Sequence, residues 1–226
     1  MVDNANMNYQ YPMFIKMTIM KTKIYTAGKA LQQAKAALIM VHGRGGSAAD
    51  ILTLAQHLDV NDFALLAPQA DQNTWYPYSF LAVPAKNEPS LSAALAALAE
   101  AVKEAEDAGI SRENIYFLGF SQGACLTLEF VARNASRYGG VVAFTGGLIG
   151  DRIYEENYQG DFGSTPIFIG TSDPDPHVPV DRVLASTAVL RKMNASVLEK
   201  IFPVMGHTIT GEEIRLANQW VFGAGG

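Results

Sequence analysis

The chain has 226 residues, of which 49% are apolar and 17% charged, and a formal net charge of −5. This composition supplies a large buried core, so a disordered chain is excluded, and the length fits one α/β domain. The mild negative charge, with no cluster of Lys and Arg interleaved with aromatics, argues against a nucleic-acid partner.

The cysteine and histidine content excludes two further classes of protein. Cys125 is the single cysteine, so the chain cannot form an internal disulfide. The four histidines have no cysteine neighbours at a zinc-ligand spacing. We therefore expect neither a disulfide-held scaffold nor a metal site.

The N-terminal segment resembles a targeting sequence only in being apolar at residues 11–20 (YPMFIKMTIM). Lys16 interrupts this run, Asn-rich rather than basic residues precede it, and no small-residue cleavage pattern follows. We expect residues 1–20 to be an N-terminal extension, forming either an extra strand or a surface tail, and residues 21–226 to be one domain. No other stretch approaches the length of a membrane span.

Strand and helix patterns alternate along the rest of the chain. Short apolar runs, together with one edge segment, predict strands at 21–28, 36–41, 63–67, 115–118, 139–144, 166–170 and 196–202. Helical spacing predicts helices at 49–58, from Ser90 or Ser92 to Gly109, and at 122–133, 180–193 and 211–222. The alternation predicts an α/β fold with a mostly parallel, doubly wound sheet flanked by helices.

Residues 119–123 (GFSQG) follow a predicted buried strand and open a predicted helix. In this context the serine projects from a strained turn, and Gly119 and Gly123 remove side chains that would collide. A serine hydroxyl is a weak nucleophile near neutral pH and needs an adjacent base. We expect Ser121 to be a catalytic nucleophile; a chance turn is the alternative.

An acid and a histidine follow Ser121 in the chain order that such a site requires. His207 comes after the last predicted strand, where a loop histidine can act as a general base. The pattern leaves the acid open, because Asp173 and Asp175 both lie in the loop after the strand at 166–170.

Taken together, the motifs resemble those of the carboxylesterase, lysophospholipase and acyl-protein thioesterase group of α/β-hydrolases. The matching segments are 41–46 (VHGRGG), 119–123, 173–179 (DPDPHVP) and 206–207. The resemblance covers nearly all of residues 21–226 and implies that they form an α/β-hydrolase catalytic domain. In that family the acid lies three residues before the Val of the Val-Pro pair, which selects Asp175 over Asp173.

An oxyanion hole needs two backbone N–H donors, one from the residue after the nucleophile and one from a loop after an early strand. We expect the amides of Gln122 and Arg44 in these roles, since glycines let the 42–46 loop turn its amides inward. Relatives often carry Leu in place of Arg44 and Asp in place of Gly46. The Arg44 side chain is expected to contact a polar or anionic part of the substrate, or else to reach solvent or a surface acid.

Aromatic residues in the long connection at 68–89 are candidates for a substrate pocket. Trp75 stands where the family's Trp lines the acyl pocket, and we expect it to form the pocket wall. For Tyr76 and Phe80 the pattern favours contact with the substrate and ordinary core packing equally. We name Tyr76, together with Trp75, as a candidate substrate-binding residue. Residues 147–164 are too few for a separate cap domain.

Three remaining residues are expected to have no part in the chemistry. Cys125 is interpreted as a buried structural thiol, because it lies one turn beyond Ser121 on a helix that packs under the sheet. His57 is interpreted as a solvated helix residue and His177 as a turn residue.

The resemblance implies a serine carboxylesterase that hydrolyses short- to medium-chain esters through an acyl-enzyme, without a cofactor. An acyl-protein thioesterase or lysophospholipase is the alternative within this chemistry, and a non-catalytic binding protein is the alternative outside it. A dienelactone-type hydrolase would carry Cys at position 121. We expect a small-molecule ester substrate, no stable membrane association, a cytoplasmic location, and a monomer or homodimer.

Overall fold

A computed structural model describes residues 22–223, and the predicted extension at 1–20 lies outside them. The strands within this range form a seven-stranded sheet in the order β1-β3-β2-β4-β5-β6-β7. They are β1 Ile24–Gly28, β2 Ala36–Val41, β3 Phe63–Pro68, β4 Ile115–Phe120, β5 Gly140–Phe144, β6 Pro166–Asp173 and β7 Ser196–Pro203. Edge strand β1 is antiparallel to β3, and every other pair is parallel. The predicted mostly parallel sheet is confirmed.

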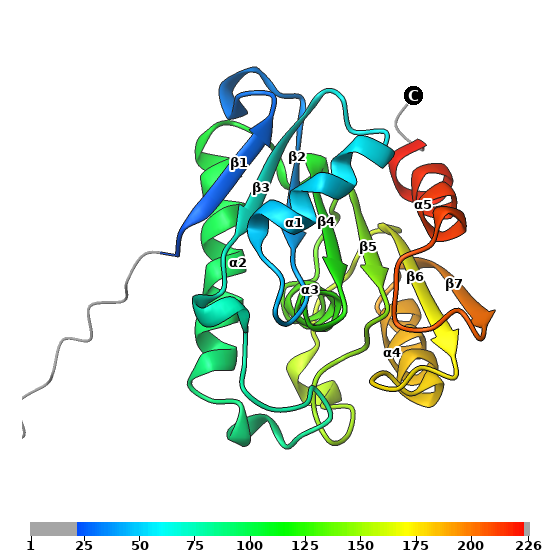
Figure 1. Cartoon of the computed structure of the whole chain (residues 1–226). Coiled ribbons are helices and arrows are strands. Elements are labelled where there is room, and N and C mark those ends of the chain that lie inside the picture. Colours follow the sequence, from blue (N-terminus) through cyan, green and yellow to red (C-terminus); the bar gives the residue numbers. More distant parts are fainter. Residues whose placement is uncertain (1–21, 224–226) are drawn as a thin grey trace, which may run out of the picture.

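Helices cover both faces of the sheet (Figure 1). They are α1 Ala48–Leu52, α2 Ser90–Asp107, α3 Gln122–Arg133, α4 Val180–Lys192 and α5 Gly211–Ala217. Successive side chains of a strand point to opposite faces, so Ile39 and Val41 join the core layer that contains α2, α3 and α4. Leu38 and Met40 join the layer that contains α1 and α5. The doubly wound arrangement is therefore confirmed.

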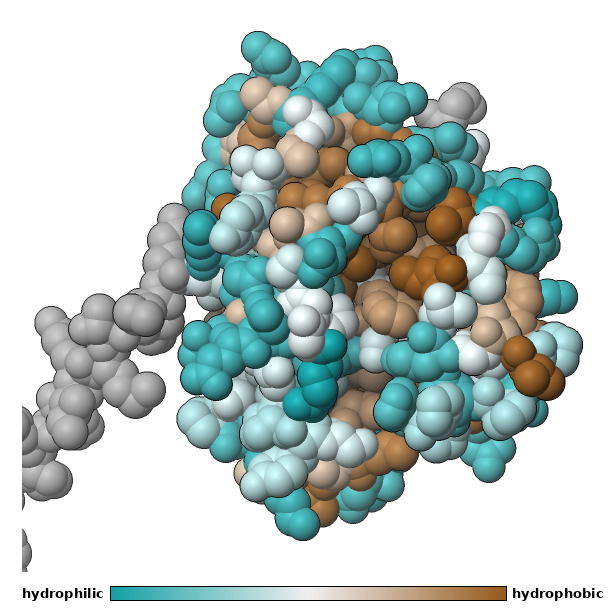
Figure 2. Space-filling view, in the orientation of Figure 1, coloured by the Kyte–Doolittle hydropathy of each residue, from teal (hydrophilic) through white to brown (hydrophobic). Residues whose placement is uncertain are grey.

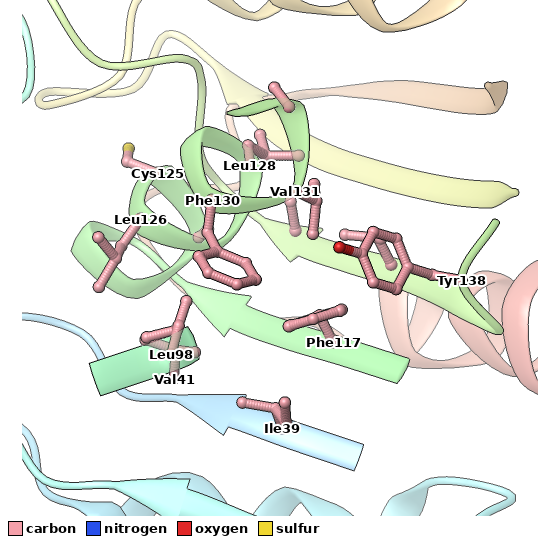
Figure 3. Packing of buried hydrophobic residues seen from close by; sticks show 14 of the residues in the cluster. Ile39, Val41, Leu98, Phe117, Cys125, Leu126, Leu128, Phe130, Val131 and Tyr138 are labelled. Atoms are coloured by element: carbon pink, nitrogen blue, oxygen red, sulfur yellow. The ribbon is translucent and has the colours of Figure 1, made fainter. Parts of the chain in front are cut away.

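Helix α3 is buried from Gln122 to Ala132 and lies against β4. The ring of Phe130 packs on that of Phe117 from β4, with ring centroids 5.7 Å apart (Figure 3). Most of its buried residues are apolar, as a helix enclosed on every side requires, and the buried Gln122 and Glu129 side chains are hydrogen-bonded. Packing thus fixes the N-terminal end of α3, which Ser121 precedes.

Helix boundaries differ from prediction where local contacts decide them. The helix expected at 49–58 splits into α1 and a 3-10 segment at Thr53–His57, and the C-terminal helix changes to a π turn at Asn218–Phe222. Neither expected serine caps α2. Instead the Glu88 carboxylate accepts hydrogen bonds from the amide and hydroxyl of Ser92.

The connection between β5 and β6 contains no cap domain. Within the described range, its regular structure is a 3-10 turn at Glu155–Asn157. None of the helices in residues 22–223 has the length and apolar character needed to cross a membrane.

Candidate active site

A cavity of about 420 Å³ opens where the parallel strands end at their carboxyl termini. Ligands of open α/β sheets bind at this edge, because the loops that follow the strands converge there. Figure 2 shows this face of the molecule, on which apolar surface lies among hydrophilic residues. Ser121, at the end of β4, and His207, in the loop after β7, both line the cavity.

Ser121 occupies a sharp turn between β4 and α3. Its φ of 54° and ψ of −118° lie outside the usual regions for an L-residue, a strain that the surrounding packing must hold. A Cβ at Gly119 would overlap the backbone of Gly123, and a Cβ at Gly123 would overlap the Val41 carbonyl. The two glycines therefore permit the close approach of helix and strand that aims Ser121 outward.

The predicted nucleophile, base and acid form a continuous chain of hydrogen bonds. Ser121 Oγ lies 2.8 Å from His207 Nε2, to which its hydroxyl donates. His207 Nδ1 lies 2.9 Å from Asp175 Oδ2, and its N–H donates to this oxygen. In this arrangement the imidazole offers a basic nitrogen to the serine hydroxyl.

The acid that meets His207 is Asp175 and not Asp173. The second oxygen of Asp175, Oδ1, accepts the backbone amides of His177 and Val178, both at 2.8 Å. Burial raises the pKa of Asp175, but these amides and the His207 ring outweigh it and hold the pKa below its ordinary value. Asp173 is exposed, and its backbone carbonyl accepts the amide of Val204.

The loop that carries His207 is tied to β6 by a further hydrogen bond. The Gly206 amide donates to Ser172 Oγ at 2.9 Å, and the φ of Gly206, 81°, is one that glycine adopts without strain. The His207 ring rests on Phe120, with ring centroids 5.3 Å apart. The imidazole is therefore held on three sides, by Asp175, Phe120 and its own loop.

Two backbone amides beside Ser121 are free to bind an oxyanion. Gln122 is the first residue of α3, so its N–H has no intrahelical acceptor. The Arg44 amide likewise donates to no group among residues 22–223, whereas the next two amides, of Gly45 and Gly46, are hydrogen-bonded. The helix dipole of α3 adds partial positive charge at the same place.

The Arg44 side chain is exposed, but among residues 22–223 it pairs with backbone carbonyls and not with a surface acid. Its guanidinium donates to the carbonyls of Tyr76, Pro77 and Tyr78 at 2.8 to 3.0 Å. The Gln122 side chain also donates to the Tyr76 carbonyl and accepts the Trp75 amide. These contacts hold the 75–78 segment against the 42–46 loop and so shape the cavity wall.

The expectation that Trp75 forms the pocket wall is wrong. Trp75 is buried behind the lining, where its indole N–H donates to the His42 carbonyl and its ring packs on the imidazole. His42 Nε2 accepts a hydrogen bond from the Ala70 amide. The ring proton is therefore on Nδ1, which donates to the Gly43 carbonyl. Burial lowers the pKa of His42, which keeps it neutral. Trp75 and His42 thus brace the loop from beneath, and Tyr76 takes the place at the wall.

Sequence reasoning missed two aromatic neighbours of the base. His177, interpreted as a turn residue, is exposed but lines the cavity, and its ring meets that of His207 edge to face, with centroids 4.8 Å apart. Phe120 supports the other side. Phe120 lies within GFSQG, and His177 lies two residues after Asp175. Their closeness to these motifs in the sequence was the signal that could have placed them beside His207.

No cluster of three or more His, Cys, Asp or Glu in the described range could hold a metal ion.

The profile of the family described as Phospholipase/Carboxylesterase matches residues 28–221. The chain belongs to this family. A crystal structure of a phospholipase/carboxylesterase from Dyadobacter fermentans superposes with a TM-score of 0.88 at 53% identity, covering 89% of this chain and 96% of that one. The match confirms the α/β-hydrolase fold and the family resemblance noted in the sequence.

Relatives in plants and yeast carry hydrolase names. The "Probable carboxylesterase SOBER1-like" of Arabidopsis thaliana is 26% identical over 205 residues, 83% of this chain and 78% of the relative. An acyl-protein thioesterase 1 of Saccharomyces cerevisiae is 31% identical over 173 residues, 66% of this chain and 74% of the relative. The family member described here is accordingly a hydrolase with esterase function.

Proposed function

We propose that this family member is a serine carboxylesterase that cleaves short- to medium-chain esters through an acyl-enzyme. The observation that carries the proposal is the chain of hydrogen bonds from Asp175 through His207 to Ser121. A strained elbow, two free amides and an adjoining cavity support it. Residues 21–226 then act as one catalytic domain.

In this mechanism Ser121 Oγ attacks the ester carbonyl while His207 Nε2 takes the hydroxyl proton. Asp175 keeps the proton of Nδ1 in place and stabilises the imidazolium that forms. The amides of Gln122 and Arg44 bind the developing oxyanion. His207 then protonates the leaving alcohol, and a water molecule, deprotonated by the same imidazole, releases the acid.

The size of the cavity supports small acyl groups. A volume of about 420 Å³ falls toward the small end of ligand pockets. One wall includes the segment at Tyr76, whose carbonyl Arg44 and Gln122 hold in place. We expect acetyl to octanoyl esters to be accepted and palmitoyl esters to be poor substrates.

A series of p-nitrophenyl esters from acetate to palmitate tests the function. We expect kcat/KM for the octanoyl and shorter esters to exceed that for palmitate at least about tenfold. The Ser121→Ala variant should lose turnover by about 10⁶-fold while folding normally. Hydrolysis that persists in Ser121→Ala would refute the nucleophile, and a maximum at palmitate would refute the chain-length assignment.

The yeast relative named acyl-protein thioesterase makes S-acyl substrates the second candidate. The same acyl chains offered as oxygen esters and as thioesters separate the two. We expect the oxygen esters to keep a higher kcat/KM after correction for their lower intrinsic reactivity, and a consistent thioester preference would reverse the assignment.

We further propose that the enzyme acts in the cytoplasm on small-molecule esters, without stable membrane association, as a monomer or homodimer. The single cysteine, whose thiol is buried and free, suits a reducing compartment. Light scattering during size-exclusion chromatography tests the assembly, and cosedimentation with vesicles tests the membrane expectation.

A further inference from the structure

The cavity beside Ser121 carries a charge opposite in sign to that of the whole protein. Arg44 is a permanently charged residue in its lining, and neither Asp nor Glu is among the lining residues in the part of the chain that the structure describes. The protein has 22 Asp and Glu against 17 Lys and Arg, so its net charge is negative. The cavity is therefore positive in a negatively charged protein.

Two carboxylates beside lining residues are committed to other partners. The Asp175 side chain is fully buried and accepts hydrogen bonds from the His207 ring and from two backbone amides. Glu129, which acts on Tyr76, is also fully buried and forms an ion pair with Arg133 at 2.7 Å. Arg44 pairs with no acid among residues 22–223. Its charge is therefore not neutralised at the cavity by an ion pair of its own.

The Arg44 guanidinium lies at the exposed rim of the cavity. The carbonyls to which it donates belong to Tyr76, Pro77 and Tyr78, and all three of these residues line the cavity. Carbonyl partners hold a guanidinium in place but leave its positive charge intact. The Nε–H donates to no group among residues 22–223, and the residue is exposed. A ligand can therefore reach a fixed cation at this rim.

Covalent structure limits how far this cation lies from a bound ester. The proposed oxyanion hole includes the Arg44 amide, and the amide and the guanidinium belong to the same residue. A carbonyl oxygen held by the amide is therefore no more than one arginine side chain away from the positive charge. Unit charges at such a range still attract each other near a protein surface. A carboxylate placed a few bonds from the scissile carbonyl comes within this range.

The lining separates the place for charge from the place for apolar groups. Phe80, Cys125 and Val178 are buried, whereas Arg44 and His177 are exposed. Moving a carboxylate from water to apolar surroundings is costly, and at the rim it keeps its contact with water. The apolar part of a substrate therefore fits the buried lining, and a charged part fits the rim.

We propose that the preferred substrates are short esters that carry a carboxylate near the scissile carbonyl, and that Arg44 selects them through its positive charge. This inference rests on the proposed function of Ser121 and names the class of ester on which it acts. The carboxylate belongs to the acid half or to the alcohol half of the ester, and two sets of substrates distinguish these sources.

Two isosteric pairs of esters test the proposal, because a carboxamide has the shape of a carboxylate without its charge. Monoethyl succinate and ethyl succinamate place the group on the acid half. Butyryloxyacetate and butyryloxyacetamide place it on the alcohol half. Titration of the released acid at constant pH gives the ratio of kcat/KM for the carboxylate over the carboxamide in each pair. Comparing this ratio between variants cancels the intrinsic reactivity of the esters.

Arg44→Met removes the charge at a similar side-chain length, and Arg44→Lys keeps it. We expect Arg44→Met to lower the carboxylate-to-carboxamide ratio about tenfold in at least one pair, and Arg44→Lys to stay within about threefold of wild type. Both variants disturb the 75–78 segment and are expected to slow all four esters. A purely structural role would slow the carboxylate and the carboxamide equally. The pair whose ratio falls shows which half of the ester carries the carboxylate.

Arg137→Met is the matched control. Arg137 is also exposed and donates to a backbone carbonyl, that of Gly163, but it lies outside the cavity lining. The variant changes the net charge of the protein by the same amount as Arg44→Met and should leave both ratios unchanged. In the wild type, raising the ionic strength from about 0.02 M to about 0.5 M should lower the ratio that Arg44 controls, because salt screens exposed charges.

Ratios in Arg44→Met within about twofold of wild type in both pairs, or an equal fall in Arg44→Lys or Arg137→Met, would overturn the proposal. If Arg44→Met is too slow to assay, a wild-type ratio that does not fall with salt in either pair would overturn it. So would a wild type that cleaves p-nitrophenyl butyrate but neither carboxylate ester. Hydrolysis retained by Ser121→Ala would instead overturn the proposed function.

Discussion

Replacing Asp175 by Asn tests whether this carboxylate orients the His207 imidazole for catalysis or only stabilises the loop that contains it. Oδ1 of Asp175 accepts two backbone amides, so an asparagine would keep its oxygen there and turn its NH₂ group toward His207. The NH₂ group can only donate, which forces Nδ1 to accept and moves the imidazole proton to Nε2. The nitrogen that faces Ser121 then has no lone pair to receive the hydroxyl proton.

The expected loss in kcat is about 10⁴-fold, which is what a wrong tautomer costs in a serine triad and corresponds to about 5 kcal/mol of transition-state stabilisation. Turnover of p-nitrophenyl butyrate measures it, with circular dichroism and melting temperature to establish folding. Asp173→Asn is the control: this carboxylate is exposed, so activity should change by less than about twofold. Equal losses in the two variants, or the larger loss in Asp173→Asn, would refute the assignment.

Three further predictions concern the elbow, a buried carboxyl and the cysteine. Gly123→Ala should destabilise the fold by at least about 3 kcal/mol, because its Cβ would overlap the Val41 carbonyl, while Gly211→Ala, with open space at Cβ, should be nearly neutral in chemical denaturation. Burial raises the pKa of Glu213, so folding favours its protonated form, and the contribution of Glu213 to stability falls as pH rises from a glutamate's ordinary pKa through the raised pKa of the folded protein. Glu213→Gln should therefore be more stable than wild type at pH 8 but not at pH 4; a difference in melting temperature that does not change with pH would contradict this. Burial raises the pKa of Cys125 to about 12, so iodoacetamide should modify it only after unfolding, and rapid labelling of the native protein would count against the buried thiol.

The strands and the elbow could be predicted because their signals are local. Strand β2 is apolar at all six positions and buried at all of them, as a central parallel strand must be. Positions 119 and 123 must be glycine because helix and strand approach each other closely there, and a Cβ at either position would overlap backbone atoms. Both glycines lie within the pentapeptide, so the sequence motif alone predicts this approach. The order of nucleophile, acid and base then follows from the topology of the sheet.

The cavity wall could not be predicted in the same way, because its shape depends on contacts between distant segments. Arg44 holds carbonyls that lie more than thirty residues later in the chain, and no local pattern records that pairing. The fixed position of this segment turns Trp75 inward against His42 and brings Tyr76 to the lining. Only the assembled fold distinguishes these two neighbouring aromatics.

The nucleophile is tested most directly by covalent labelling with a fluorophosphonate followed by peptide mass spectrometry. A nucleophilic Ser121, activated by His207, should form one adduct on the peptide that contains residues 119–123, with loss of esterase activity in proportion to labelling. Ser121→Ala should take up no label. An adduct on a different residue, or full esterase activity in fully labelled protein, would contradict the role of Ser121.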